Sequence, residues 1–190
     1  DLSRFRENMD EKRMLFRQKY QIADDEIAIG IIGRLVPVKN HRLFLEALKI
    51  LNSKTNKKIR AFIVGDGESR EIIKSNAINL GIDFVNGQGD FRNASLTFTS
   101  WIREIDYVTA GLDIIALTSL NEGTPVSLIE AQAAGKPVVS TRVGGIEDVV
   151  IPGKTALLSQ PDDVPGFTDN LCKLVESDSL RRQLGEKGWP

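Results

Sequence analysis

The chain has one cysteine and one histidine among its 190 residues, and both shortages narrow its chemistry. A single cysteine, Cys172, cannot form an internal disulfide and is typical of a reducing compartment, so we expect a cytoplasmic location. The aspartates Asp66, Asp90 and Asp113 are scattered over different segments, and no cluster has the spacing of metal ligands. We therefore expect no metal site and no bound cofactor.

Charge of one sign and long apolar runs are also lacking. The 25 Lys and Arg residues are matched by 26 Asp and Glu residues, which leaves a formal charge of −1 and predicts no nucleic acid partner. No apolar run approaches the roughly 18 residues that indicate a membrane-spanning helix. These absences favour a soluble protein in which any anion site is local.

What the sequence does contain is an alternation of two kinds of apolar segment. Short, continuous, β-branched segments indicate strands that are covered on both faces, and the patterns between them indicate helices. Strand followed by helix, repeated along the chain, predicts an α/β fold with a three-layer α/β/α, Rossmann-like parallel sheet. The predicted strands are residues 27–33, 59–65, 112–118 and 136–141, with shorter candidates at 82–86 and 155–159.

Two helical predictions are specific enough to test. The helix after the second strand places Ile72, Ile73 and Ile78 on its apolar side and ends at a glycine, Gly81, that could cap it. Near the end of the chain, residues 163–188 are predicted to form a closing helix pair.

The length predicts one domain, residues 1–190, with a single well-buried core. Residues 1–22 are strongly charged and form either an opening helix that docks on this domain or a helix that belongs to a preceding one. The chain starts at Asp1 and stops at Gly-Trp-Pro, so we expect a fragment of a longer protein. A trimmed form of a complete small protein is the alternative.

Ligands of an open α/β sheet bind beyond the carboxyl ends of the strands, so the loops there are the candidate site. After the first strand, Arg34 and Lys39 are two cations that suit a diphosphate, and a solvated surface pair is the simpler alternative. After the second strand, Gly65 and Gly67 suit either close approach to a ligand or a plain turn.

The stretch NEGTPVSLIEAQAAG places Glu122 and Glu130 on either side of a helix start. Thr124 is predicted to cap a helix that begins at Pro125 and ends near Gly135. Free amides at this start would attract a phosphate, and carboxylates on both sides suit the vicinal diols of a ribose and a sugar. The alternatives are a neighbouring cation as the partner of Glu130 and backbone amides capped by Glu122.

Together these motifs resemble the retaining glycosyltransferases of family four, whose fold is called GT-B. Glu122, seven intervening residues and Glu130 are similar to the E-x7-E signature of that family. GRLVPVKN looks like its diphosphate loop, and VGDGE looks like its second glycine turn. The resemblance covers about residues 27–188 and implies a carboxyl-terminal, donor-binding domain without its amino-terminal acceptor domain.

The resemblance assigns a role to each matched residue. Arg34 and Lys39 would hold the donor diphosphate, Glu122 the hydroxyls of the transferred sugar, and Glu130 the ribose hydroxyls. Arg34, Lys39 and Glu122 are thus the residues assigned to catalysis, which would retain the anomeric configuration without a protein nucleophile or a metal. The other donor contacts are assigned to Gly65, Gly67, Thr99, Gly123, Thr124, Pro125 and Val126.

The substrates are implied only as classes. The donor would be a UDP-sugar or a GDP-sugar, with adenosine as a further base, and the base would lie near LTFTSW, against Thr99 and Trp101. Trp101 suits a core position equally well. The acceptor would be a glycan or a lipid-linked glycan bound by the missing domain, with the parent protein attached peripherally to the cytoplasmic face of a membrane. His41 is predicted to be a surface or capping residue.

Three other functions are weighed against this one. A sugar-nucleotide epimerase of related GT-B architecture would need more catalytic carboxylates and histidines than the chain has. The second alternative is not an enzyme: a nucleotide-sugar binding or regulatory module, or a structural domain with a decayed site. The presence together of Arg34, Lys39, Glu122 and Glu130 argues against decay. A response-regulator-like domain would need an acidic cluster after the first strand, where this chain has Arg34.

Overall fold

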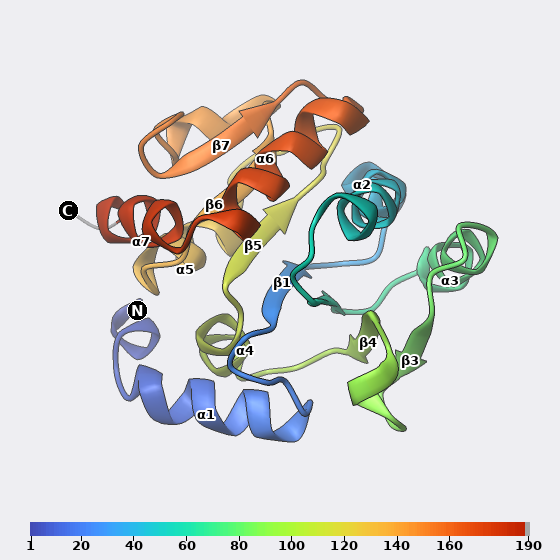
Figure 1. Ribbon diagram of the computed structural model, residues 1–190. Helices are drawn as coiled ribbons and strands as arrows, with labels where there is room; N and C mark the ends of the chain where they lie inside the picture. Colours follow the sequence, from blue (N-terminus) through green and yellow to red (C-terminus); the bar gives the residue numbers. More distant parts are fainter. Residues whose placement is uncertain (189–190) are drawn as a thin grey trace.

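Seven parallel strands run through the middle of the molecule in the order β3-β4-β2-β1-β5-β6-β7 (Figure 1). The computed structural model describes residues 1–188. The strands are β1 (Ile27–Ile32), β2 (Ile59–Val64), β3 (Phe84–Asn86), β4 (Leu96–Ser100), β5 (Ile114–Leu117), β6 (Val138–Thr141) and β7 (Ala156–Ser159).

Helices cover both faces of this sheet. α2, α3, α6 and α7 pack on one face, and α1, α4 and α5 pack on the other (Figure 1). The prediction of a three-layer α/β/α sheet is confirmed. The helices are α1 (Met9–Lys19), α2 (His41–Lys54), α3 (Arg70–Asn79), α4 (Ile105–Gly111), α5 (Val126–Ala133), α6 (Val164–Glu176) and α7 (Asp178–Lys187), with short 3₁₀ turns η1 (Ser3–Phe5), η2 (Pro37–Lys39), η3 (Phe91–Asn93) and η4 (Gly144–Asp148).

The central strands are buried on both sides, which explains their continuous apolar sequences. All six residues of β1 and all six of β2 are buried. Within β1, Ile29 and Ile31 belong to the core under α2 and α6, whereas Ala28 and Ile32 belong to the core under α1 and α4. A strand with two covered faces has no solvent side to mark with polar residues.

Most predicted elements are present. Each of the six predicted strands contains an observed one, and the closing pair is α6 and α7. The apolar side of α3 was partly wrong, because Ile73 and Ala77 are buried while Ile72 and Ile78 are 62% and 65% exposed. Residues four apart share a helix face, and Ile72 and Ile78 lie to either side of the one that packs. Gly81 follows α3 with φ +69°, as expected of a glycine that ends a helix.

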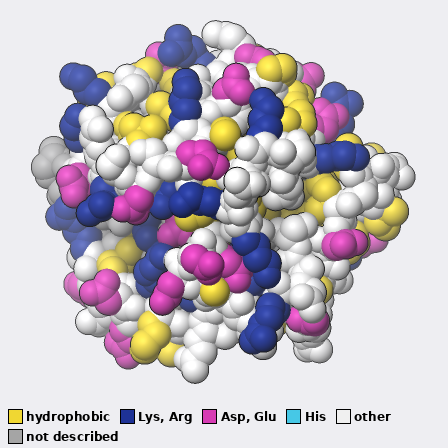
Figure 2. Space-filling model, viewed as in Figure 1, with side chains coloured by type: hydrophobic (Ala, Val, Ile, Leu, Met, Phe, Trp, Pro, Cys, Tyr) yellow, Lys and Arg dark blue, Asp and Glu magenta, His cyan; other side chains and the backbone are white. Residues whose placement is uncertain are grey.

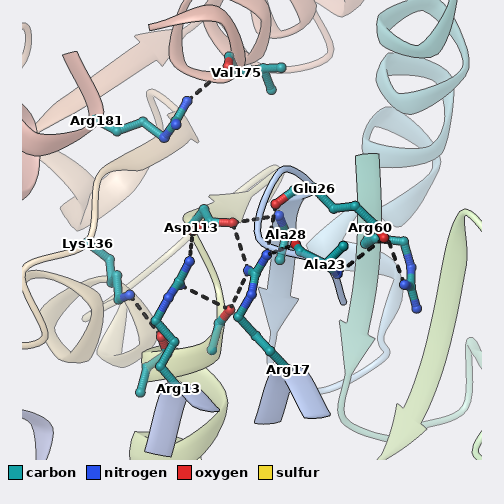
Figure 3. A network of polar contacts seen from close by, with 12 residues as sticks. Arg13, Arg17, Ala23, Glu26, Ala28, Arg60, Asp113, Lys136, Val175 and Arg181 are labelled. Carbon is teal, nitrogen blue, oxygen red and sulfur yellow. Dashed lines mark hydrogen bonds and ion pairs between the residues drawn. The ribbon is translucent and has the colours of Figure 1, made fainter. Parts of the chain in front are cut away.

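The charged opening segment forms α1, which packs against α4 and buries Phe16 completely. Arg13 and Arg17 of α1 both reach Asp113 at the start of β5, with N–O distances of 2.8 and 3.2 Å (Figure 3). Asp113 also accepts the Ala28 N–H at 2.8 Å. Burial would raise the pKa of Asp113, but the two arginines and this amide hold it below its usual value. Charge and apolar packing therefore both fix α1 to the sheet.

The surface is mixed in charge. Figure 2 shows positive and negative side chains interspersed over the face in view, in keeping with the formal charge of −1. Within residues 1–188, no helix combines the length and the apolar character needed to span a lipid bilayer.

The strand order identifies one edge of the sheet as the place for a ligand. From β1 the chain moves to β2 on one side, and it later returns to β5 on the other side of β1. At such a switch point the loops after the two strands run in opposite directions and leave a crevice between them. Here these are residues 33–40 after β1 and residues 118–125 after β5.

Candidate functional site

A cavity of about 360 Å³ opens at this switch point. It lies between the loops after β1 and β5, the segment after β4, and the start of α5. A larger cavity of about 660 Å³ lies beside α1 at the other end of the strands, but none of the predicted site residues line it. The residues that line the switch-point cavity are Ile32, Gly33, Lys39, Trp101, Ile105, Glu122, Thr124, Pro125, Val126, Ser127 and Glu130.

Lys39 and Glu122 meet at one side of the cavity. The Lys39 ammonium forms an ion pair with Oε1 of Glu122, and the Ser119 hydroxyl donates to the same oxygen at 2.5 Å. The Glu122 side chain is only 8% exposed, so this pairing satisfies a charge that has little contact with water. The Thr118 hydroxyl donates to the Lys39 carbonyl at 2.7 Å, which fastens the two loops together.

The start of α5 differs from the prediction. Pro125 occupies the cap position with ψ 85°, outside the helical range, so the helix begins one residue later at Val126. Thr124 therefore lies one residue before the cap position, and the prediction that it caps the helix was wrong. Among residues 1–188, the N–H groups of Val126 and Ser127 have no hydrogen-bond partner, and both residues line the cavity. The helix start thus offers donors to an anion.

Glu130 lies one turn into α5 and faces the same cavity. Its side chain is 17% exposed and accepts no hydrogen bond from residues 1–188. Arg4 forms an ion pair with it, with an N–O distance of 3.9 Å. Burial raises the pKa of Glu130 above its ordinary value, with Arg4 opposing and Asp106 adding to the shift. Because no hydrogen bond is donated to it, this carboxylate keeps its acceptor capacity for a ligand. A group that binds hydroxyls requires such capacity.

Arg34, the other predicted cation, is exposed and does not line the cavity. Its guanidinium has no ion-pair or hydrogen-bond partner within the described part of the chain. The guanidinium is therefore free to move, and it stands two residues after the end of β1 at the same edge of the sheet.

Gly65 and Gly67 contact neighbouring backbone instead of lining the cavity. A Cβ on Gly65 would fall 1.9 Å from the Gly33 carbonyl oxygen, and one on Gly67 would fall 2.4 Å from the Leu35 carbonyl oxygen. Both glycines thus let the loop after β2 lie directly against the loop after β1. In this structure they support the predicted diphosphate loop from behind.

Trp101 is 59% exposed and lines the cavity, so the alternative that it is a core residue was wrong. Thr99 is half-buried, its hydroxyl donates to the Ser100 carbonyl at 2.9 Å, and it is not part of the cavity wall. Side chains two residues apart, such as those of Thr99 and Trp101, point to the same side of a strand only while the strand stays regular. Ser100, with φ +63°, interrupts it.

His41 was predicted to be a surface or capping residue, and the structure contradicts this. It is 4% exposed, at the start of α2, beside a separate pocket of about 200 Å³. Burial, helped by the charge of Lys39, lowers the pKa of His41 to about 4. The preceding Asn40 holds the cap position with φ +47°. Its side-chain amide donates a hydrogen bond to the Asp162 carboxylate at 3.3 Å and does not cap the helix.

The sequence analysis missed three residues at or beside the site. Ser119, three residues before Glu122, could have been suspected as its hydrogen-bond partner, because a hydroxyl often bonds locally. Ile105 forms part of the wall from α4, a helix that the apolar pattern did not reveal. Arg4 is 126 positions from Glu130, and no sequence spacing joins them.

Three comparisons place the chain among known proteins. The family model described as glycosyl transferases group 1 matches residues 12–189. The D-inositol 3-phosphate glycosyltransferase of Corynebacterium jeikeium is 31% identical over 192 residues, which cover 98% of this chain and 44% of that protein. The lipopolysaccharide core biosynthesis glycosyltransferase LpsE of Rhizobium meliloti is 27% identical over 172 residues, 90% of this chain and 46% of that protein. The chain thus spans less than half the length of these curated relatives.

Solved structures agree in fold. HepE of Anabaena, crystallised in complex with UDP, superposes with a TM-score of 0.83 at 21% identity, over 99% of this chain and 49% of that one. The C-terminal domain of a glycosyl transferase group 1 family protein, LpcC of Francisella tularensis, superposes with a TM-score of 0.76 at 22% identity, over 96% of this chain and 90% of that one. The fold of this chain matches such carboxyl-terminal domains.

Proposed function

Because this chain belongs to the glycosyl transferases group 1 family, we propose that it is the donor-binding half of a retaining, metal-independent glycosyltransferase. The observation that carries the proposal is the cavity at the β1–β5 switch point, where Lys39, Glu122, Glu130 and two unpaired amides face one another. A nucleoside-diphosphate sugar has an anion between two sets of hydroxyls. Cations and amides between two carboxylates complement that order.

The proposed pose follows from these charges. The diphosphate lies between the Lys39 ammonium and the N–H groups of Val126 and Ser127, and Arg34 swings in from its exposed position. Glu130 accepts the two ribose hydroxyls. Glu122 accepts hydroxyls of the transferred sugar with the oxygen that Lys39 and Ser119 leave free. The exposed face of Trp101 supports the base.

The pose also accounts for catalysis. As the bond between the sugar and the distal phosphate breaks, negative charge grows on the leaving nucleoside diphosphate. Lys39 and the amides at the start of α5 face that charge and stabilise it without reorganisation, and Arg34 adds its charge once it has swung in. The same groups could replace a divalent cation, which is the basis for proposing metal independence. Retention is proposed from the resemblance to the retaining family, and no residue is proposed as a nucleophile.

The bound nucleotide and the acceptor are proposed as classes. UDP is the first candidate for the nucleotide because the similar HepE was crystallised with UDP. GDP and ADP are the other two candidates. The acceptor is a glycan or a lipid-linked glycan, which a domain outside this chain would hold, and the parent protein would attach peripherally to the cytoplasmic face of a membrane. By itself, the chain is expected to bind donor and to transfer little sugar.

Calorimetric titration of UDP, GDP, ADP and their sugar conjugates, with and without magnesium, tests this proposal. We expect one nucleotide to bind selectively, with the same affinity when magnesium is chelated, and Glu130→Ala to remove most of that binding. Glu71→Ala is the matched control, because the Glu71 side chain is 83% exposed on α3 and distant from the cavity. Absence of binding to every nucleotide at millimolar concentration, or equal binding by Glu130→Ala, would overturn the proposal.

A further inference from the structure

The amino-terminal turn η1 lies against the candidate site. It packs on α4 and α5, and Phe5 is 1% exposed, which anchors the turn. Arg4 stands beside this anchor, with its guanidinium 5.0 Å from the centre of the Phe5 ring. The family match begins at residue 12, so this turn lies outside the matched region.

The contact joins Arg4 to the buried carboxylate in the cavity wall. Nη2 of Arg4 lies 3.9 Å from Oε1 of Glu130, with side chains 50% and 17% exposed. No other described cation is paired with Glu130, and no described residue donates a hydrogen bond to it. The arginine approaches one oxygen, so the carboxylate keeps acceptor capacity for a ligand in the cavity.

Lys12 strengthens this arrangement from α1. Its ammonium donates to the Arg4 carbonyl at 2.6 Å, which fixes the backbone of the turn. The same ammonium pairs with Asp106 of α4 at 2.8 Å. The negative charge of Asp106 opposes ionisation of Glu130. Lys12 therefore holds the backbone of Arg4 in place and also offsets the charge of Asp106.

The charges around Glu130 thus act in two directions. Burial raises its pKa, the charge of Arg4 lowers it, and the charge of Asp106 raises it. Lys39 and Glu122 line the same cavity but are paired with each other. A protonated Glu130 would lose part of its acceptor capacity and would bind two hydroxyl donors less well.

We infer that Arg4 is a positioning residue, which keeps Glu130 ionised and oriented for the ribose hydroxyls of the bound nucleotide. The inference rests on the proposed function, in which Glu130 accepts those hydroxyls. It adds that a segment before the matched family region sets how strongly, and down to what pH, the site binds a nucleotide.

The test is calorimetric titration of Arg4→Gln, Arg4→Lys and wild type between pH 5 and 8, with the tightest-binding nucleotide among UDP, GDP and ADP. We expect Arg4→Gln to bind it roughly two- to fivefold more weakly at pH 7, the range of an exposed ion pair. The loss should grow toward pH 5, and Arg4→Lys should restore most of the affinity. Inorganic pyrophosphate, which has no ribose, should bind equally to all three.

The matched control is Arg182→Gln, which removes the same charge from an arginine 70% exposed on α7. Thermal melting of each variant checks that folding is intact. If Glu130→Ala loses nucleotide but Arg4→Gln keeps the wild-type affinity and pH profile, the inference on Arg4 is overturned and the proposed function stands. Equal loss of pyrophosphate would also overturn it, as a general charge effect. If the wild type binds no nucleotide, both proposals fail together.

Discussion

Lys39 and Glu122 form an ion pair that joins the loop after β1 to the loop after β5. The two residues come from opposite sides of the switch point, and they would hold neighbouring parts of one donor, its diphosphate and its sugar. Their pairing keeps both charges in place before a ligand arrives. A site prepared in this way needs less reorganisation on binding.

Replacing Lys39 with methionine should affect both folding and binding. The free energy of unfolding should fall by about 1–2 kcal/mol, because the 8% exposed Glu122 side chain loses its cation. Nucleotide affinity should fall with it, since the diphosphate loses a positive charge. Urea unfolding and calorimetry measure the two effects. Lys154→Met, at an exposed lysine, serves as control, and retention of full UDP affinity by Lys39→Met would exclude Lys39 from the diphosphate site.

Gly144 supports Glu122 through its backbone, so Gly144→Ala should damage the site. A Cβ there would lie 2.0 Å from the Glu122 carbonyl oxygen, and φ is +47°. We expect a loss of about 2–4 kcal/mol in the free energy of unfolding, together with weaker nucleotide binding. Gly153→Ala shares the left-handed conformation, with φ +75°, but meets open space, so about 1 kcal/mol is expected. Equal effects of the two variants would refute this steric explanation.

His41 should remain neutral well below the usual range of histidine. Since it is the only histidine, its imidazole proton resonances in an NMR titration belong to one residue. They should titrate with a pKa of about 4 instead of 6.5. Between these values the unfolded chain binds more protons, so the free energy of unfolding should fall as pH drops from 6.5 to 4, by up to about 3 kcal/mol from this group. His41→Phe should lack this share, and a midpoint near 6.5 would contradict the burial of the ring.

Trp101 should report directly on the nucleotide base. In a Trp189→Phe background it is the only tryptophan, and its exposed ring lines the cavity. Binding of UDP should change its fluorescence, whereas pyrophosphate should leave it nearly unchanged. Trp101→Leu should weaken the binding of UDP by about 1–3 kcal/mol, the range for a base stacked on an aromatic side chain. A fluorescence change with pyrophosphate equal to that with UDP would argue against stacking.

The layers of the fold could be predicted because strands that are buried on both faces have continuous apolar sequences. β1 and β2 are mainly apolar runs without a polar alternation, as expected of parallel strands that are covered on both faces. The short helix α4 was not predicted, because its seven residues form barely two turns and show too little apolar periodicity. The exposed Ile72 and Ile78 misled for a related reason, since apolar residues also occur singly on surfaces.

The site was predictable in its main charges but not in its local geometry. Lys39 and Glu122 stand out because their loops follow strands that end at one edge, and Glu130 lies in the helix that follows one of these loops. The cap of α5 depended on one backbone angle of Pro125, which no composition rule determines. The burial of His41 and the approach of Arg4 to Glu130 depend on tertiary packing between distant segments, which a single sequence does not reveal.

The order of the strands also sets when the site can exist during synthesis. β1 gains one neighbour from β2 early, but its other neighbour pairs Ile29 with Ile114, far later in the chain. A growing polypeptide that has reached β4 carries Arg34 and Lys39 without either glutamate opposite them. The nascent chain therefore exposes one wall of the cavity first, and the site closes only when α5 has left the ribosome.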